Sequence, residues 1–438
     1  MDSALEKSAM RKIYLRLLPF AVLSYILAYV DRINVSFAAL TMRGDLDMSA
    51  AAFGFAAGTF YWAYFLFEVP SNVILEKVGA RVWIARIMIT WGIVAGLTAF
   101  VTGTTSFAVV RFLLGVAEAG FFPGLVLYFT YWFPSRHHAR IVSGFLIGLP
   151  IAVAAGAPIS TALLGLDGLF GLKGWQIMYI AEAIPTVAIG VVTLFLLTDR
   201  PEQARFLTAE ERSWVATKLA GERKAKEAVR TFTMWQAMRD PKVLLLALNY
   251  FGIVTASLGM LLFIPQIIKS LGQSSNMTVG WLTMIPYICG GLAMLVWGRV
   301  SDRMNERRWN LFFGCVVATA GLVLAGATMG TWWALVGASI AAMGFYGSKG
   351  PFFAMPPMFL SGTGLAAGIA WINSIGNLGG FFGPWYVGLM KDWTGSFAGG
   401  LYGLALLCLI SSAVCAFFLH IPNRSVPAAT SAMGAPAE

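Results

Sequence analysis

The sequence Asn72-Val-Ile-Leu-Glu-Lys-Val-Gly-Ala-Arg81 follows the second long apolar run of the chain, and a related sequence, Gly298-Arg-Val-Ser-Asp-Arg-Met-Asn-Glu-Arg307, follows the eighth. Both copies have a small or polar residue, then an acid and a base, then a turn residue and a closing arginine. The same short motif at the same place in two halves indicates an internal repeat, which is common in membrane carriers. The repeat therefore predicts two similar halves.

Apolar runs of membrane length recur along the whole chain. About 20 apolar residues are needed to cross a hydrocarbon core of about 30 Å. We identify such runs at 15–40, 51–75, 82–102, 106–133, 139–165, 175–198, 242–269, 278–301, 309–329, 332–358, 364–390 and 397–420. The expected fold is therefore an all-α membrane protein with twelve transmembrane helices in two six-helix halves.

The composition excludes a soluble protein. Of 438 residues, 58% are hydrophobic and 12% are charged, whereas soluble proteins carry about 25% charged residues. The net charge of +10 does not indicate a nucleic-acid partner, because the basic residues lie in short loops between the apolar runs. The expected environment is a lipid bilayer, and we expect no nucleic acid to bind.

The basic residues also predict the orientation. They precede the first run and follow the second, fourth and eighth, whereas the alternate loops are poor in them or pair them with acids. Positive loops stay in the cytoplasm. We therefore expect a multi-pass protein of a bacterial-type inner membrane with both termini cytoplasmic.

The one long polar interval divides the chain. We expect a first half at 1–198, a cytoplasmic linker at 199–241, a second half at 242–424 and a disordered tail at 425–438. Within the linker, Thr208-Ala-Glu-Glu211 has the spacing of a capping box, which predicts the start of a helix along the inner face.

The charged residues of the repeated motif have two interpretations. They can form a cytoplasmic gate, in which an acid at one helix end pairs with a cation on a neighbour in one state of the protein. Such a contact contributes about 1 kcal/mol at a partly wet surface, which suits a contact that must open. They can also serve only to keep the loops inside. The residues concerned are Glu76, Lys77, Arg81, Asp302, Arg303 and Arg307.

We single out four charged residues inside the expected spans. Asp31 and Arg32 lie in the first span, and Arg111 and Glu118 lie in the fourth, two helical turns and about 10 Å apart. A charge at mid-membrane costs about 2.5–3.5 kcal/mol, so each is a functional candidate. A purely structural pairing of two acids with two bases is the alternative.

These residue types suit the joint binding of an anion and a proton. The arginine fork can hold a substrate carboxylate with two hydrogen bonds. A buried acid loses the support of a cation when that cation turns to the substrate, so it takes up a proton. Anion and proton binding would then favour each other.

Further polar and aromatic residues are candidates for a central cavity. Lys349 lies among Gly and Pro in the tenth span, which suggests a broken helix lining a cavity, although its side chain could also reach toward water. Asn373 and Asn377 share one helix face and can bind substrate or join helices. The aromatic candidates are Tyr29, Tyr64, Tyr287 and Phe353.

No residue pattern indicates catalysis or a metal. The four cysteines lie inside apolar runs without metal-ligand spacing, and the three histidines lie at loop or span ends. We therefore expect no enzyme activity, no metal and no cofactor, with protons as the coupling ion and a monomeric protein.

Four motifs in order resemble the anion:cation symporter family of the major facilitator superfamily. They begin at Tyr29 (Tyr-Val-Asp-Arg-Ile-Asn), Arg111 (Arg-Phe-Leu-Leu-Gly-Val-Ala-Glu-Ala-Gly-Phe-Phe-Pro), Asp199 (Asp-Arg-Pro-Glu-Gln-Ala-Arg-Phe-Leu-Thr) and Asn373 (Asn-Ser-Ile-Gly-Asn-Leu-Gly-Gly-Phe-Phe-Gly-Pro). The first copy of the repeated loop departs from the usual form, with Asn72 and Glu76 in place of Gly and Asp.

The resemblance implies uptake of a small organic anion with protons. It implies that the acids at Asp31 and Glu118 carry protons, that Arg32 contacts substrate and that Arg111 tunes Glu118. The absence of a polar side chain near Gly148–Pro150 favours an aromatic carboxylate or a small dicarboxylate over a sugar acid.

Three other functions are each disfavoured by one feature of the sequence. An exporter of drugs or metabolites with the same fold often has Gly-x-x-x-Gly-Pro in its fifth span, and Gly156-Ala-Pro158 matches this only in part. A neutral-sugar facilitator is disfavoured by the intramembrane charges. A membrane enzyme or receptor is disfavoured because the sequence offers no nucleophile–base pair.

Overall fold

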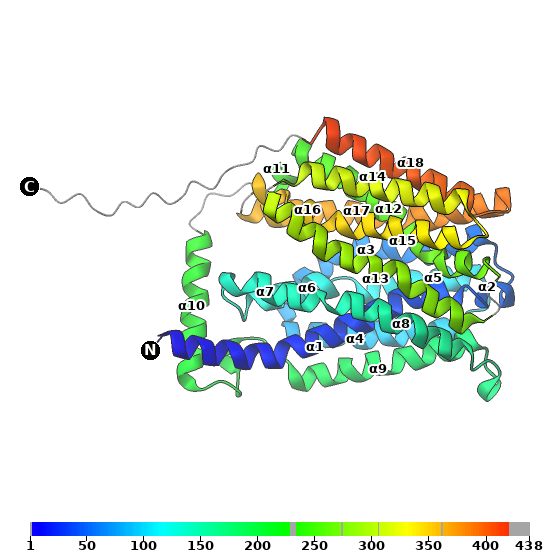
Figure 1. The fold of residues 1–438 in the computed structure, drawn as a ribbon. Helices are drawn as coiled ribbons and strands as arrows, with labels where there is room; N and C mark the ends of the chain where they lie inside the picture. Colours follow the sequence, from blue (N-terminus) through cyan, green and yellow to red (C-terminus); the bar gives the residue numbers. More distant parts are fainter. Residues whose placement is uncertain (1, 228–233, 273–274, 305, 361, 420–438) are drawn as a thin grey trace, which may run out of the picture.

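The protein is a bundle of long helices that lie side by side (Figure 1). The computed structural model describes residues 2–227, 234–272, 275–304, 306–360 and 362–419. The helices of the first half are α1 Asp2–Ala38, α2 Met42–Asp45, α3 Ala50–Val78, α4 Ala80–Leu97, α5 Thr104–Glu118, α6 Phe121–Thr130, α7 Ser135–Leu146, α8 Gly148–Leu164 and α9 Gly174–Leu196. Those that follow are α10 Ala209–Glu227, α11 Met234–Arg239, α12 Pro241–Lys269, α13 Asn276–Met304, α14 Arg308–Ala327, α15 Trp332–Gly347, α16 Lys349–Phe353, α17 Gly362–Thr394 and α18 Ala398–Phe417.

The predicted spans are found with small changes at their ends. Ten segments of the described chain are long and apolar enough to cross a membrane, and α15 with α16, and α17, occupy the other two predicted places. The first helix begins at Asp2, so the polar N-terminal segment extends α1 beyond its apolar part. The expected tail at 425–438 lies outside the described residues.

Three of the predicted spans are divided between two helices: the fourth, the fifth (α7 and α8) and the tenth (α15 and α16). The fourth is divided into α5 and α6 at Gly120, whose φ of +88° is open mainly to glycine. A Cβ atom at Gly120 would also clash with the Ser71 hydroxyl of α3. The close approach of α3 therefore depends on glycine at this break.

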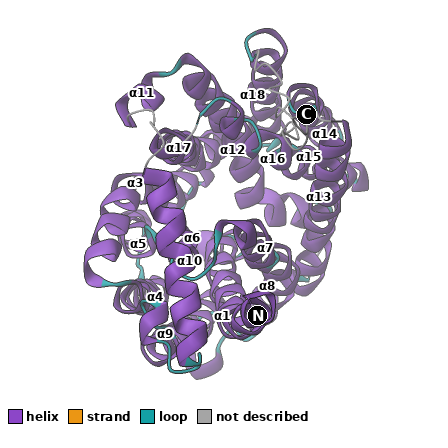
Figure 2. Ribbon diagram, turned by 90° about the vertical axis from the view of Figure 1, so that its left-hand side faces the viewer, coloured by secondary structure: helices purple, strands orange, loops and turns teal. Residues whose placement is uncertain are grey.

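The helices form two groups, seen from the end of the bundle in Figure 2. Within the first group α4 packs on α9 and α3 on α5, and within the second α14 packs on α15 and α18, and α12 on α17. The groups meet where α3 packs on α17 and α8 on α13. This arrangement agrees with the two halves that the repeated motif predicts.

Glycines form the seam between α3 and α17. A Cβ atom at Gly54 or Gly58 of α3 would clash with the backbone of Pro384 or Phe381, and one at Gly388 of α17 would clash with the backbone of Ala50. The two backbones are therefore in direct contact at these glycines, and beside them the rings of Phe55 and Trp62 of α3 contact Phe381 of α17.

The end of the bundle that holds α2 carries polar contacts between the halves. Asp392 of α17 accepts hydrogen bonds from the amides of Ala50 and Ala51, at 2.9 and 2.7 Å, and so caps the first turn of α3. Arg43 donates to Gln266 of α12 at 2.6 Å. These contacts hold the α2 end of the two halves together.

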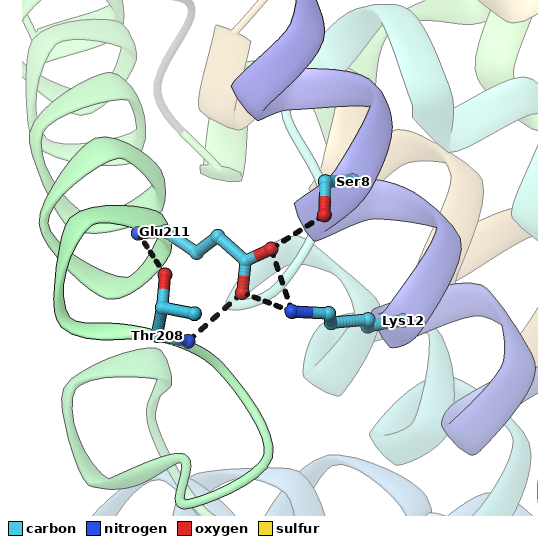
Figure 3. A network of polar contacts seen from close by, with 4 residues as sticks. All are labelled: Ser8, Lys12, Thr208 and Glu211. Atoms are coloured by element: carbon cyan, nitrogen blue, oxygen red, sulfur yellow. Dashed lines mark hydrogen bonds and ion pairs between the residues drawn. The ribbon is translucent and has the colours of Figure 1, made fainter.

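The linker helix α10 lies across the other end, over the first half (Figures 1 and 2). The predicted capping box is present, because the Glu211 amide donates to the Thr208 hydroxyl at 3.2 Å and the Thr208 amide donates to Glu211 at 2.8 Å. Glu211 also accepts hydrogen bonds from Ser8 and Lys12 of α1, at 2.7 and 2.8 Å (Figure 3). One carboxylate thus both begins α10 and attaches it to α1.

We expect Glu211→Ala to release α10 from α1, because the capping contact and the ion pair are lost together. Burial opposes ionisation of Glu211, but the hydrogen bonds from Lys12, Ser8 and the Thr208 amide outweigh it and lower its pKa to about 2. Since this pKa lies below the ordinary value of 4.5, the attachment is complete above that pH and is lost as the pH falls toward 2. Faster hydrogen exchange of the α10 amides measures the release. Exchange as slow as in the parent protein would contradict the attachment.

Candidate functional site

Arg32 and Glu118 form an ion pair between α1 and α5 of the first half. Arg32 of α1 donates from Nε and Nη2 to the same oxygen, Oε1 of Glu118 on α5, at 2.6 and 2.5 Å. The Glu118 side chain is 1% exposed, and its other oxygen, Oε2, has no hydrogen-bond partner. The pair therefore holds one carboxylate oxygen twice and leaves the second oxygen open to a proton.

Aromatic rings surround the guanidinium of Arg32. Its Cζ atom lies 5.4 Å from the ring centre of Tyr29, 5.6 Å from that of Phe60 and 5.1 Å from that of Tyr64. Cations are attracted to ring faces at such distances. The structure thus brings the predicted Tyr29 and Tyr64 to the predicted arginine.

Arg111 lies near this pair without bonding to Glu118. Its Nε donates to the Ala57 carbonyl at 3.4 Å, and its guanidinium lies 5.0 Å from the ring centre of Phe60. Arg32 and Arg111 line a small cavity that α12 and α17 close from the other half. Both arginines therefore lie at the boundary between the halves.

Asp31 faces away from Arg32 and does not join this pair. It is 2% exposed and accepts hydrogen bonds from Trp91 of α4, at 2.8 Å, and Thr186 of α9, at 3.2 Å. The predicted four-residue set is therefore divided into an arginine site at the boundary and a separate acid between α1, α4 and α9.

The second half contributes Lys349 at a break in its tenth span. The span is interrupted after Gly347, as the local Gly and Pro predict, and α16 begins at Lys349. The Lys349 ammonium lies 4.6 Å from the ring centre of Tyr346 and within electrostatic range of Tyr29 of the first half. Lys349 therefore supplies a cation from the opposite side of the boundary.

We expect Lys349→Ala to weaken the binding of a dianionic substrate by about 10-fold, since a loss of about 1.4 kcal/mol changes an equilibrium constant tenfold. The affinity of the purified protein for small dicarboxylates, measured by isothermal titration calorimetry, tests this. Lys349→Arg retains the charge and should bind more tightly than the alanine variant. An affinity equal to that of the parent would assign Lys349 a structural role.

Asn373 meets an acid that the sequence prediction did not include. The carboxyl of Glu68 on α3 interacts with the side chains of Asn373 and Ser374 on α17, across the boundary. Glu68 is 8% exposed and within electrostatic range of Arg32. Asn377 lies half-buried one turn further along α17.

The other predicted aromatic residues are spread over the second half. Tyr287 of α13 lies 6.5 Å from Tyr346 between ring centres and lines a small gap with Leu149 and Val153 of α8. Phe353 contacts Tyr250 edge to face at 5.4 Å. Of Tyr287 and Phe353, only Tyr287 lines a cavity of the described chain together with residues of the first half.

Two arginines of the repeated motif form hydrogen bonds in the structure. The amide of Arg81 donates to Asp199 at 2.8 Å, and Arg307 donates to Ser301 at 2.9 Å. Glu76, Lys77 and Arg303 are exposed, and the side chain of Asp302 lies outside the described part of the chain. The gate therefore stays a prediction.

Sequence reasoning missed Glu68 and Glu182, both of which are buried acids inside apolar runs. The rule that selected Asp31 and Glu118, that a charge inside the membrane is a functional candidate, applies to them equally. A count of every acid within the predicted spans would have found them.

The fold and the boundary site define a membrane carrier, with two helical halves around charged groups at their interface. The family model of the Major Facilitator Superfamily matches residues 21–384 and 264–437, and the chain belongs to that superfamily. Its members transport solutes, have no enzyme activity and share a fold of twelve helices in two halves.

Bacterial transporters are among the relatives by sequence. A protein of Agrobacterium vitis named as a tartrate transporter is 50% identical over 93% of this chain and 90% of its own length. A quinolone resistance transporter of Acinetobacter baumannii is 40% identical over 92% and 93%. The metabolite transport protein NicT of Pseudomonas putida is 39% identical over 96% of both chains. The predicted resemblance to anion:cation symporters is confirmed.

Solved structures show the same fold at low sequence identity. A bacterial homolog of the human lysosomal transporter Spinster has a TM-score of 0.75 and 15% identity, and covers 91% of this chain and 95% of its own. A D-xylose-proton symporter has a TM-score of 0.74 and 14% identity, and covers 93% and 98%.

Proposed function

We propose that the protein imports a small hydroxylated dicarboxylate of the tartrate type together with protons, across a bacterial inner membrane. The contact between Arg32 and Glu118 carries the proposal, because it places the anion-binding cation and the proton-binding acid in one ion pair. The relatives named as tartrate transporters, 50% identical along most of the chain, support the choice of substrate.

The ion pair couples the two ligands by exchange of partners. A substrate carboxylate that binds the Arg32 fork displaces Glu118 from Nε and Nη2. Glu118, which is buried without another hydrogen-bond partner on Oε2, then takes a proton and becomes neutral. Proton uptake in turn frees Arg32 for the anion, so each ligand favours the binding of the other.

A dicarboxylate can also join the two halves. One carboxylate binds Arg32 of the first half, and the second binds the ammonium group of Lys349 of the other half. Contacts made to both halves at once favour the state in which they close on the substrate. A dicarboxylate has one carboxylate for each of the two cations, which gives a reason for selecting dicarboxylates.

The proposal includes an orientation of the protein in the membrane. The basic loops place α10 and the first helix end in the cytoplasm, so the polar contacts of Arg43 and Asp392 lie on the periplasmic side. The periplasmic contacts then break when the carrier opens outward, and the motif residues near Glu76 and Asp302 form the gate on the cytoplasmic side. The protein acts as a monomer and needs no cofactor.

A second candidate function is export of drugs or metabolites in exchange for protons, and the 40% identity to a quinolone resistance transporter favours it. Proteoliposomes that contain the purified protein and an internal pH dye distinguish the two. External tartrate should acidify the interior under the proposed function. The absence of acidification with tartrate, together with proton movement driven by a quinolone gradient, would establish the exporter instead.

A further inference from the structure

A second buried acid lies apart from the arginine site. Glu182 on α9 is 6% exposed, and its two oxygens accept hydrogen bonds from Asn34 of α1 at 2.9 Å and from Ser160 of α8 at 2.7 Å. Both donors are neutral. The carboxyl group is thus held firmly in the interior of the first half, although no cation balances it among these contacts.

Asp31 lies on the same seam between α1 and α9. Asp31 and Asn34 are one turn apart on α1, and Glu182 and Thr186 are one turn apart on α9. Asn34 donates to Glu182, and Thr186 donates to Asp31 at 3.2 Å. The two helices therefore exchange hydrogen bonds, and the two acids lie within electrostatic range of each other.

The surroundings do not support two negative charges. Asp31 faces Glu182 of α9 and Glu118 of α5, and its donors are the neutral Trp91 and Thr186. Among the described residues, no ion pair includes Asp31 or Glu182. Two carboxylates close together in a low dielectric cannot both stay ionised, so such a pair retains a proton.

A hydroxyl group stands between this pair and the arginine site. Tyr179 is one turn before Glu182 on α9, it is 2% exposed, and its hydroxyl has no hydrogen-bond partner. It lies within electrostatic range of Arg111, Glu182 and Asp31. A buried hydroxyl without a partner costs free energy, and it keeps both its donor and its acceptor sites available. It can therefore pass a proton between the two groups of acids.

We propose that Glu182 is a second proton-binding residue of the transport cycle and shares a proton with Asp31 across the seam of α1 and α9. The inference rests on the proposed function. Uptake of one proton converts a carboxylate of the pair into a carboxylic acid and removes one negative charge from the seam. Its release to water restores the charge. The seam thus carries a proton in addition to the one on Glu118.

The test is the number of protons moved per tartrate in proteoliposomes, measured with an internal pH dye and radiolabelled tartrate. Glu182→Gln should keep tartrate exchange, which needs no net proton movement, and should move fewer protons per tartrate with a flatter pH profile. Ser160→Ala removes one donor from the Glu182 carboxylate, so it should shift the pH profile toward higher pH. An unchanged proton ratio and pH profile in both variants would overturn the inference.

Infrared difference spectroscopy supplies a readout that needs no transport. A pH titration of the parent protein should show a carboxylic-acid C=O band that Glu182→Gln lacks and that Glu182→Asp restores at a shifted position. A band that persists unchanged in Glu182→Gln would overturn the inference. If the parent protein moves tartrate without protons, the proposed function fails. In that case the infrared titration alone tests whether Glu182 binds a proton.

Discussion

Arg32→Ala is expected to abolish tartrate uptake and to weaken tartrate binding by about 100-fold or more. Truncating one partner of a buried, hydrogen-bonded charge pair costs about 2–5 kcal/mol, and here the lost group is also the one that binds the substrate. The variant leaves Glu118 without the cation that it contacts at 2.5 Å. Calorimetric titration of the detergent-purified variant with tartrate measures the loss.

Two further variants separate charge from geometry. Arg32→Lys retains a cation but not the planar fork, so it should bind tartrate with intermediate affinity. Arg86→Ala removes a half-buried arginine of α4 that lies over Trp83, away from the boundary cavity, and should bind tartrate as the parent does. Tartrate affinity that survives Arg32→Ala would refute the assignment of the anion site.

Glu118→Gln is expected to retain tartrate binding and exchange while losing accumulation driven by a pH gradient. Glutamine keeps a carbonyl oxygen that Arg32 can contact but cannot take up or release a proton. Exchange of internal for external tartrate needs no proton and should continue. Accumulation against a concentration gradient should fall well below that of the parent, as followed with radiolabelled tartrate.

A matched acid-to-amide control is offered by Glu202, which is exposed on the linker. Glu202→Gln should leave both exchange and accumulation as in the parent. Accumulation that remains intact in Glu118→Gln would show that the proton is carried elsewhere, and the Asp31–Glu182 pair would be the next group to examine.

The spans could be predicted because membrane length and apolarity are local properties of the chain. Each predicted run corresponds to a helix or to a broken pair of helices, and the break at Lys349 was visible in its Gly and Pro neighbours. The extension of α1 to Asp2 was not foreseen. Its polar and basic residues precede the first apolar run, and its helical form is accompanied by contacts with Glu211, about 200 residues away in the sequence.

The partners of the charged residues could not be predicted, because they depend on how each helix is rotated against its neighbours. Asp31 and Arg32 are adjacent in the sequence but point to different helices. Arg111 and Glu118 share a helix, yet Glu118 pairs with Arg32 of α1. Residue type gave the candidates, and packing between helices decided which of them meet.

The backbone contact between α3 and α17 at their glycines has a consequence for how the two halves move. Where ridges of side chains interlock, a change in the angle between two helices forces rotamers to change and breaks close contacts. Gly54, Gly58 and Gly388 remove those ridges. At these three positions the backbones can shift past each other without a change of rotamer. Only the rings beside them, such as Phe55 against Phe381, must adjust when the halves rock and the charged groups nearby change partners.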